Sequence, residues 1–174
     1  SAPAAFLERR LPMAATDGVF GATDGFALHV DGARFLPECL AVTNVTVTAL
    51  SRSLEQQGTA QMTGLAYSSA PTCPGYGFRH VFRSPPYDPT TTLTFRVAGL
   101  HKVTLEKMIV GYAQLPAFRG VEQPADAAEA AQHQPQTSGA APVWLNEGAF
   151  QLPIHLGAPA ARAPFTATGV QRFP

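Results

Sequence analysis

The stretch LAVTNVTVTAL at residues 40–50 constrains the fold most, because apolar and polar side chains alternate along it. Val45 and Val47 alternate with Thr46 and Thr48. Successive side chains of a β-strand point to opposite faces of a sheet, so this period of two is typical of a strand with one buried face. The sequence therefore requires at least one sheet whose apolar face packs against another layer.

Similar strand patterns recur along the chain, at residues 26–30, 61–67, 77–82, 91–97, 105–115 and 150–156. Segment 105–115 is more uniformly apolar around Ile109 and Val110, which predicts a central strand. Pro153 removes a backbone donor from the last segment and places it at a sheet edge. Sixteen prolines and fifteen glycines work against long helices, leaving short helical candidates at residues 4–11 and 125–132. We predict an all-β, antiparallel β-sandwich.

The length of 174 residues fits one domain. We expect an N-terminal extension at residues 1–20, the sandwich at residues 21–157 and a C-terminal tail at residues 158–174. Residues 119–142 contain no aromatic side chain and cannot bury enough apolar surface to offset their ordering entropy. They are predicted to form a long, flexible surface insertion.

Composition narrows the range of partners. Twelve basic residues balance twelve acidic ones, so the chain has no net attraction to nucleic acid or to an anionic membrane. No apolar run reaches the roughly 18 residues that a membrane-spanning helix needs. Cys39 and Cys73 belong to no CxxC pair, and two isolated thiols suit a reducing compartment better than a disulfide. The first residue is Ser rather than Met, which favours a piece of a longer protein.

Motifs for catalysis or metal binding are missing from the sequence. There is no GxSxG nucleophile motif, no HxH or HExxH, and no glycine loop that opens a helix to hold phosphate. Four aspartates, at 17, 24, 31 and 88, are candidates for a calcium site, but their Gly and Pro neighbours make turn formation the stronger interpretation. We therefore expect no enzyme activity, no cofactor, no small-molecule substrate and no nucleic-acid partner.

Four segments resemble a known family. They are Ala33-Arg34-Phe35-Leu36, the DPTTTLTFRV of residues 88–97, the MIVGYA of residues 108–113 and the last apolar segment at residues 150–156. Together they resemble a C2 domain, an eight-stranded sandwich of two four-stranded sheets. The likeness is closest to the divergent C2-like domains of coiled-coil proteins from cilia, flagella and centrosomes.

One departure from the family bears on function. Calcium-binding C2 domains carry aspartates in their first and third top loops, whereas the corresponding third loop here, residues 98–104, has no acid. In the first loop, Glu38 is the nearest acid after Asp31. The resemblance therefore implies a calcium-independent module, with the His101–Lys102 loop as a connector. We expect it to bind a protein within a cytoskeletal or ciliary scaffold, in the cytoplasm, at the cytoskeleton or in a cilium or flagellum.

An alternative is a calcium-independent, peripheral phospholipid-binding domain on an anionic membrane surface. Candidate lipid or partner contacts are the basic side chains Arg79, Arg83, Arg96, His101, Lys102 and Lys107. Because alternate residues of a strand point to opposite faces, Arg79 and Arg83 are expected on the face opposite to His80. Arg96 is expected on the face opposite to Leu93, Phe95 and Val97. The pattern permits a single basic face without establishing one. An extracellular adhesive or carbohydrate-binding sandwich and an enzyme remain further alternatives.

Overall fold

A computed structural model describes residues 20–21, 23–83, 85, 88–120 and 143–157. Within these ranges the chain is all-β, without a helix, and all strand pairs are antiparallel. The strands are β1 (Phe26–Gly32), β2 (Leu40–Leu50), β3 (Gln56–Met62), β4 (Gly75–Phe82), β5 (Thr92–His101), β6 (Lys107–Pro116), β7 (Phe118–Gly120) and β8 (Val143–Leu145).

One layer is a four-stranded sheet in the order β3-β2-β5-β6. Val47 pairs with Phe95, and Phe95 pairs with Ala113, so that one face of the sheet carries a row of buried apolar side chains. The predicted alternation is confirmed here: Val45 and Val47 are buried, and Thr46 and Thr48, which alternate with them, point to the other face.

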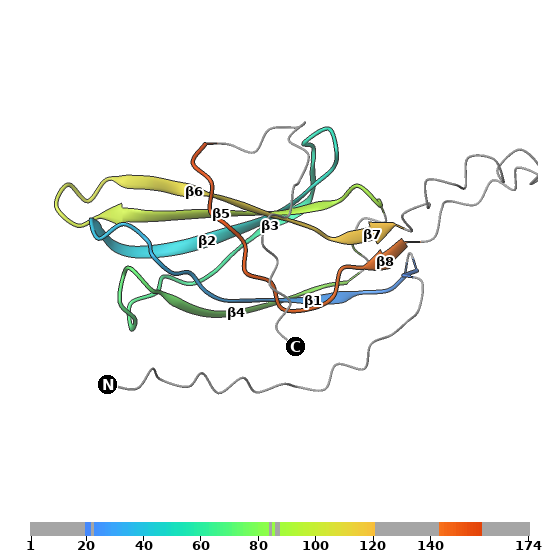
Figure 1. The fold of residues 1–174 in the computed structure, drawn as a ribbon, viewed down its shortest axis with the longest axis horizontal. Coiled ribbons are helices and arrows are strands. Elements are labelled where there is room, and N and C mark those ends of the chain that lie inside the picture. The colour runs from blue at the N-terminus through green and yellow to red at the C-terminus, as the bar shows by residue number, and fades with distance from the viewer. Residues whose placement is uncertain (1–19, 22, 84, 86–87, 121–142, 158–174) are drawn as a thin grey trace, which may run out of the picture.

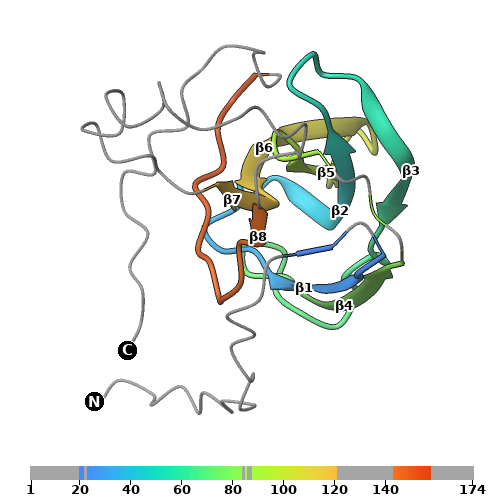
Figure 2. The same cartoon turned by 90° about the vertical axis from the view of Figure 1, so that its right-hand side faces the viewer.

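The opposite layer consists of two shorter pieces, the pair β1-β4 and the pair β7-β8. Figures 1 and 2 show these pieces facing the four-stranded sheet, an arrangement consistent with a β-sandwich. The inner face of β1-β4 is aromatic. Phe26 stacks on Phe82 with ring centroids 4.8 Å apart, and His80 meets the edge of Phe82 at 4.6 Å.

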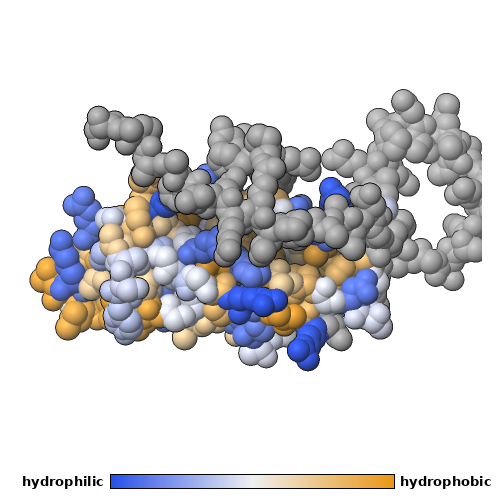
Figure 3. Space-filling model, turned by 90° about the horizontal axis from the view of Figure 1, so that it is seen from below, coloured by the Kyte–Doolittle hydropathy of each residue, from blue (hydrophilic) through white to orange (hydrophobic). Residues whose placement is uncertain are grey.

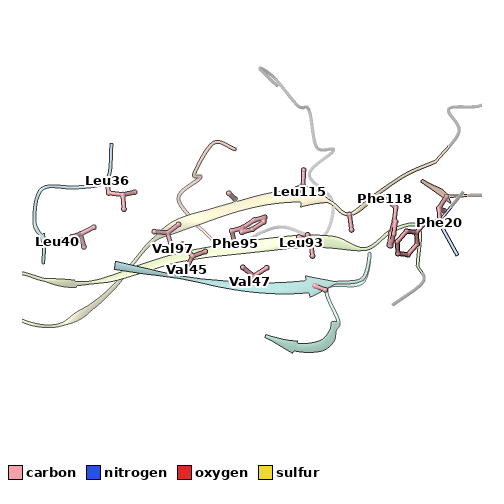
Figure 4. Packing of buried hydrophobic residues seen from close by; sticks show 14 residues of the cluster. Phe20, Leu36, Leu40, Val45, Val47, Leu93, Phe95, Val97, Leu115 and Phe118 are labelled. Carbon is pink, nitrogen blue, oxygen red and sulfur yellow. The ribbon is translucent and has the colours of Figure 1, made fainter. Parts of the chain in front are cut away.

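The core lies between the layers and is almost entirely aliphatic in the four-stranded sheet (Figure 4). At one end, the rings of Phe20 and Phe118 lie 5.0 Å apart. The backbone N–H of Phe20 donates to the carbonyl of Val143 at 2.8 Å, which ties the start of the described chain to β8. Phe20 therefore belongs to the body of the domain, one residue before the predicted boundary.

Three expectations about strands were wrong. Of the predicted strand at residues 61–67, only Gln61 and Met62 belong to a strand, β3; beyond them Thr63 and Ala66 donate backbone bonds to β2 without forming a regular ladder. Residues 150–156 form only an isolated bridge, between His155 and Tyr112, since Pro153 interrupts the donors that a ladder needs. Segment 105–115 is not central either. Its strand, β6, ends the sheet order, and the chain around Ile154 and His155 lies along its edge.

The boundaries of the predicted insertion also change. Arg119 and Gly120 belong to β7 and pair with Trp144 and Val143 of β8, so these two residues are part of the body. Residues 121–142 lie outside the described ranges, as do most of the predicted N-terminal extension, the C-terminal tail and both helical candidates. The cysteines Cys39 and Cys73 are free thiols.

Candidate functional site

Three connections between strands gather at one end of the sandwich. They are residues 33–39 between β1 and β2, residues 63–74 between β3 and β4, and residues 102–106 between β5 and β6; we call them together the loop end. Figure 1 shows them side by side, at the end away from β7 and β8.

Backbone hydrogen bonds hold these connections to one another. The N–H of Lys102 donates to the carbonyl of Cys39 at 2.7 Å, and the N–H of Leu36 donates to the carbonyl of Thr72 at 3.0 Å. The bonds join the first connection to both of the others. The loop end is therefore a single surface built from segments that are far apart in sequence.

Large apolar side chains protrude from this surface. Phe35 is 93% exposed, Tyr67 and Val103 are each 75% exposed, and Leu105 is 68% exposed. Figure 3 shows hydrophobic residues at this end, on the left of the view, beside hydrophilic ones. Single exposed apolar residues are ordinary in soluble proteins, but several gathered on one surface mark an interaction site.

Two of the four protruding residues sit on a strained backbone. Phe35 has φ of 59° and Leu105 has φ of 57°, in the left-handed region that bulky side chains rarely adopt. Such a conformation costs roughly 1–2 kcal/mol per residue. An apolar side chain held in water on a strained backbone stabilises nothing in the fold. Leu54, in the turn between β2 and β3 at the other end of the sheet, also has a positive φ, of 64°, but is only 37% exposed. The loop end differs in combining this backbone conformation with strongly exposed apolar side chains, a combination that favours a functional role.

The β5–β6 turn is organised by His101, the last residue of β5. Its Nδ1 atom accepts hydrogen bonds from the backbone N–H groups of Val103, at 3.3 Å, and Thr104, at 3.2 Å. The carbonyl of His101 accepts from the N–H of Leu105, and its own N–H donates to the carbonyl of Glu106. His101 is thus more than a connector, because it shapes the turn that displays Val103 and Leu105.

Charges of both signs surround the apolar side chains. Arg34, Lys102 and Lys107 are exposed on this surface or at its border, and so are Glu38 and Glu106. Asp31, one residue before the end of β1, adds a third negative group, so three positive groups face three negative ones and the rim is polar without being basic.

The structure separates the six predicted contact residues. Arg79 is exposed on the outer face of β4, opposite His29, and Arg83 follows the end of that strand. Arg96 lies on the outer face of the other layer, where its Nη2 donates to the hydroxyl of Thr46 at 3.4 Å. Only His101, Lys102 and Lys107 meet, at the loop end. The six residues do not form a single basic face.

The outer face around Arg96 has buried polar atoms. Among the described residues, the hydroxyl of Thr94 and the Nε of Arg96 are buried with no hydrogen-bond partner. Arg96 is partly buried, so its guanidinium is less available to a ligand than the sequence suggested.

The apolar residues of the loop end were missed from the sequence. Phe35 lies in the Ala33-Arg34-Phe35-Leu36 segment that carries the resemblance, and Leu105 begins the segment that the sequence predicts as a central strand. A signal was present in HKVTLEK at residues 101–107, where Val and Leu stand in a turn between two lysines. Apolar residues in a turn bordered by charges favour exposure over burial.

In the part of the chain that the structure describes, no group of three or more His, Cys, Asp or Glu side chains is placed to hold a metal ion. No helix among the described residues is long and apolar enough to cross a membrane. Comparison with known proteins found no family model that matches the chain and no curated protein with significant similarity. The C2-like resemblance therefore stays a prediction.

Proposed function

We propose that this chain is a non-catalytic, C2-like protein-interaction module of a larger cytoskeletal or ciliary scaffold, and that it docks on its partner through the loop end. The observation that carries the proposal is the convergence of Phe35, Tyr67, Val103 and Leu105 on one end, two of them on a strained backbone.

The chemistry of the loop end favours a protein partner. Protein interfaces combine an apolar centre, enriched in aromatic side chains, with a polar rim that excludes water. Phe35 and Tyr67 supply the aromatic groups, and the mixed charges of Arg34, Lys102 and Glu106 fit such a rim. Because the side chains protrude, the partner should offer a concave apolar pocket.

The C2-like part of the proposal rests on how the resembling segments are used. Phe95 and Val97 of the DPTTTLTFRV segment are buried in the core. Gly111, the glycine of MIVGYA, lies against the backbone of His155, since a Cβ there would lie 2.5 Å from its carbonyl oxygen. The cytoskeletal or ciliary setting follows from the resemblance alone.

A second candidate is peripheral lipid binding without calcium, and one observation favours it. Lys102 and Lys107 border the turn that exposes Val103 and Leu105, so that apolar insertion and contact with anionic headgroups would act together. The acidic groups Glu38 and Glu106 at the same surface weaken this candidate, because they oppose attraction to an anionic bilayer.

The experiment compares the wild-type chain with the triple variant F35S/V103S/L105S. A matched control is M62S/V81S, which removes two exposed apolar side chains from β3 and β4 rather than from the loop end. Each chain is used as bait in cytoskeletal extract from flagellated cells, and any enriched protein is purified and titrated directly. We expect direct binding that the triple variant loses by at least about tenfold and the control retains.

The same three chains are tested by co-sedimentation with vesicles of neutral lipid, and with vesicles containing anionic lipid at two salt concentrations. Binding that requires anionic lipid and weakens with salt, with no protein partner, would replace the proposal by the lipid candidate. Equal binding of a purified partner by the wild type and the triple variant would refute docking through the loop end.

A further inference from the structure

We propose that His101 makes the loop end pH-sensitive: its protonation dismantles the β5–β6 turn and releases the bound partner. This inference rests on the proposed docking function, because it assigns a regulation to the same surface. It needs no residue beyond those already placed at the loop end.

The hydrogen bonds at His101 are compatible with one protonation state. Two backbone donors, the N–H groups of Val103 and Thr104, point at Nδ1 from 3.3 and 3.2 Å. A neutral imidazole accepts at one nitrogen and donates at the other, so here the proton must sit on Nε2. In the charged imidazolium both nitrogens carry hydrogen, and Nδ1 would then face two N–H groups without a lone pair to offer.

The lost acceptor is bonded to the backbone of the turn that carries the apolar side chains. Val103 supplies one of the two N–H groups and is itself 75% exposed. Leu105, at φ of 57°, is held by the bond from its N–H to the His101 carbonyl. Once Nδ1 no longer accepts, the strained turn loses part of what holds it. The positions of Val103 and Leu105 then spread over many conformations.

Charged and titratable groups from each connection share this end with His101. Lys102, Glu106 and Lys107 lie on its own hairpin. The other groups are Asp31 at the end of β1, Arg34, Glu38 and Cys39 on the first connection, and Tyr67 and Cys73 on the second. Histidine is the side chain type whose charge ordinarily changes between about pH 5 and 8. His29, His80 and His155 lie elsewhere in the described chain, on β1, on β4 and beside β6.

The first test concerns the turn itself and uses the isolated chain without a partner. Backbone ¹⁵N–¹H spectra are recorded from pH 7.5 to 5.5, following the amides of Val103 and Thr104. We expect both amides to shift along the titration curve of His101 and to exchange faster with solvent at pH 5.5, after correction for the intrinsic pH dependence of exchange. In His101→Asn, an amide oxygen replaces Nδ1 as a non-titrating acceptor. The chemical shifts and corrected exchange rates of the two amides should therefore not change with pH.

The second test measures affinity for the purified partner at the same two pH values. Because Val103 and Leu105 must then be reordered on binding, we expect wild-type binding about tenfold weaker at pH 5.5 than at pH 7.5. His101→Asn should bind equally at both values, and His101→Leu, which has no acceptor, should bind weakly at both. The variants His29→Asn and His155→Asn serve as controls and should keep the wild-type pH dependence.

The outcomes separate the two proposals. Amides of Val103 and Thr104 that ignore the titration of His101, or a pH dependence of binding that survives in His101→Asn, would overturn the switch. Failure of F35S/V103S/L105S to weaken binding would instead overturn docking through the loop end, while the spectra of the isolated chain would still decide whether the turn responds to pH.

Discussion

The two ends of this sandwich use the same residue type in opposite ways. At the closed end, formed by Phe20, β7, β8 and the strand ends that meet them, the Phe20 ring is only 7% exposed and packs against Phe118. At the loop end, Phe35 is 93% exposed. A phenylalanine buried among other rings stabilises the fold, whereas one held in water can only contribute through contact with another molecule.

The backbone repeats this contrast. Phe20 is held at the closed end by a bond from its N–H to the carbonyl of Val143. At the loop end, Phe35 and Leu105 adopt positive φ values that the fold must support. Both ends contribute to the core, because Leu36 and Leu40 are buried beside the loop end. The difference between the ends is the pair of large apolar side chains, Phe35 and Leu105, that the loop end exposes, and their truncation can be tested separately from truncation of the core.

Truncating each phenylalanine gives the largest expected effect. Phe20→Ala removes a buried ring from the core and should lower the free energy of unfolding by about 3–5 kcal/mol. Phe35→Ala should change it by less than about 0.5 kcal/mol in either direction, as exposed sites do. Urea denaturation followed by the fluorescence of Trp144 measures both. A large loss of stability in Phe35→Ala would mean that the loop end is part of the structural core.

Substituting a glycine by alanine adds a Cβ atom, and this change can be compared between a closely packed position and an open one at the loop end. A Cβ on Gly111 would lie 2.5 Å from the carbonyl oxygen of His155 and 2.7 Å from the side chain of Ile154. Gly111→Ala should therefore destabilise the protein by about 1–3 kcal/mol, as overpacking does, by pushing the segment around residue 155 off β6.

Gly64, in the connection between β3 and β4 at the loop end, is the matched control. A Cβ there meets nothing within 4 Å. Gly64→Ala should leave the melting temperature unchanged or raise it slightly, because it restricts the unfolded chain. Equal losses at the two glycines would contradict the close approach of residue 155 to β6.

Strand alternation predicted the parts of the fold that pack face to face. Val45 and Val47, and likewise Leu93, Phe95 and Val97, are buried as their period of two required. β3 could not be found in this way, because Gln56–Met62 is a polar edge strand with little apolar alternation. The pairing of β7 with β8 joins residues more than twenty positions apart, which no local pattern encodes.

The candidate site was harder to predict than the fold. Of the six basic residues, His101, Lys102 and Lys107 lie at the loop end, while the other three occupy strand faces or ends elsewhere. The positive φ of Phe35 could not be read from the sequence, because glycine is the residue that normally signals it. Convergence of three connections at one end depends on topology, which single-strand patterns do not contain.

A hydrogen bond between the layers gives a smaller effect near the loop end. The hydroxyl groups of Tyr76 on β4 and Thr43 on β2 lie 2.9 Å apart. Tyr76→Phe should reduce the free energy of unfolding by about 1 kcal/mol, whereas Tyr67→Phe, at an exposed site, should have no effect.

The stability difference between the wild type and Tyr76→Phe should also depend on pH in the alkaline range. Burial raises the pKa of Tyr76 above 10.0, and its bond to Thr43 offsets part of that rise. A group whose pKa is higher in the folded state than in the unfolded state stabilises the fold fully at any pH below its pKa in the unfolded state. This contribution is lost as the pH rises through its pKa in the folded state. The difference in stability between the wild type and Tyr76→Phe should therefore shrink above about pH 10. A constant difference from pH 7 to 12 would show that Tyr76 does not titrate in this way.

The smallest expected effect lies at the closed end and appears in acid. The N–H and hydroxyl of Thr90 both donate to Oδ1 of Asp88, at 2.8 and 2.7 Å, and these bonds lower the pKa of Asp88 below 3.8. A group whose pKa is lower in the folded state than in the unfolded state stabilises the fold at any pH above its pKa in the unfolded state. That contribution disappears as the pH falls through its pKa in the folded state. Because Asp88 is near the surface, we expect a loss well below that of the Tyr76 bond, seen as a small drop in melting temperature.

Asp88→Asn is the matched variant, because its amide oxygen can still accept both bonds from Thr90 but does not titrate. The advantage of the wild type over Asp88→Asn should be present at pH 6 and vanish near pH 2, since protonation removes the charge that strengthens the bonds. Asp31→Asn, on the exposed edge of β1, corrects for the general effect of removing a carboxylate. If both variants lose their difference from the wild type in the same way, the acid response belongs to overall charge and not to the turn that leads into β5.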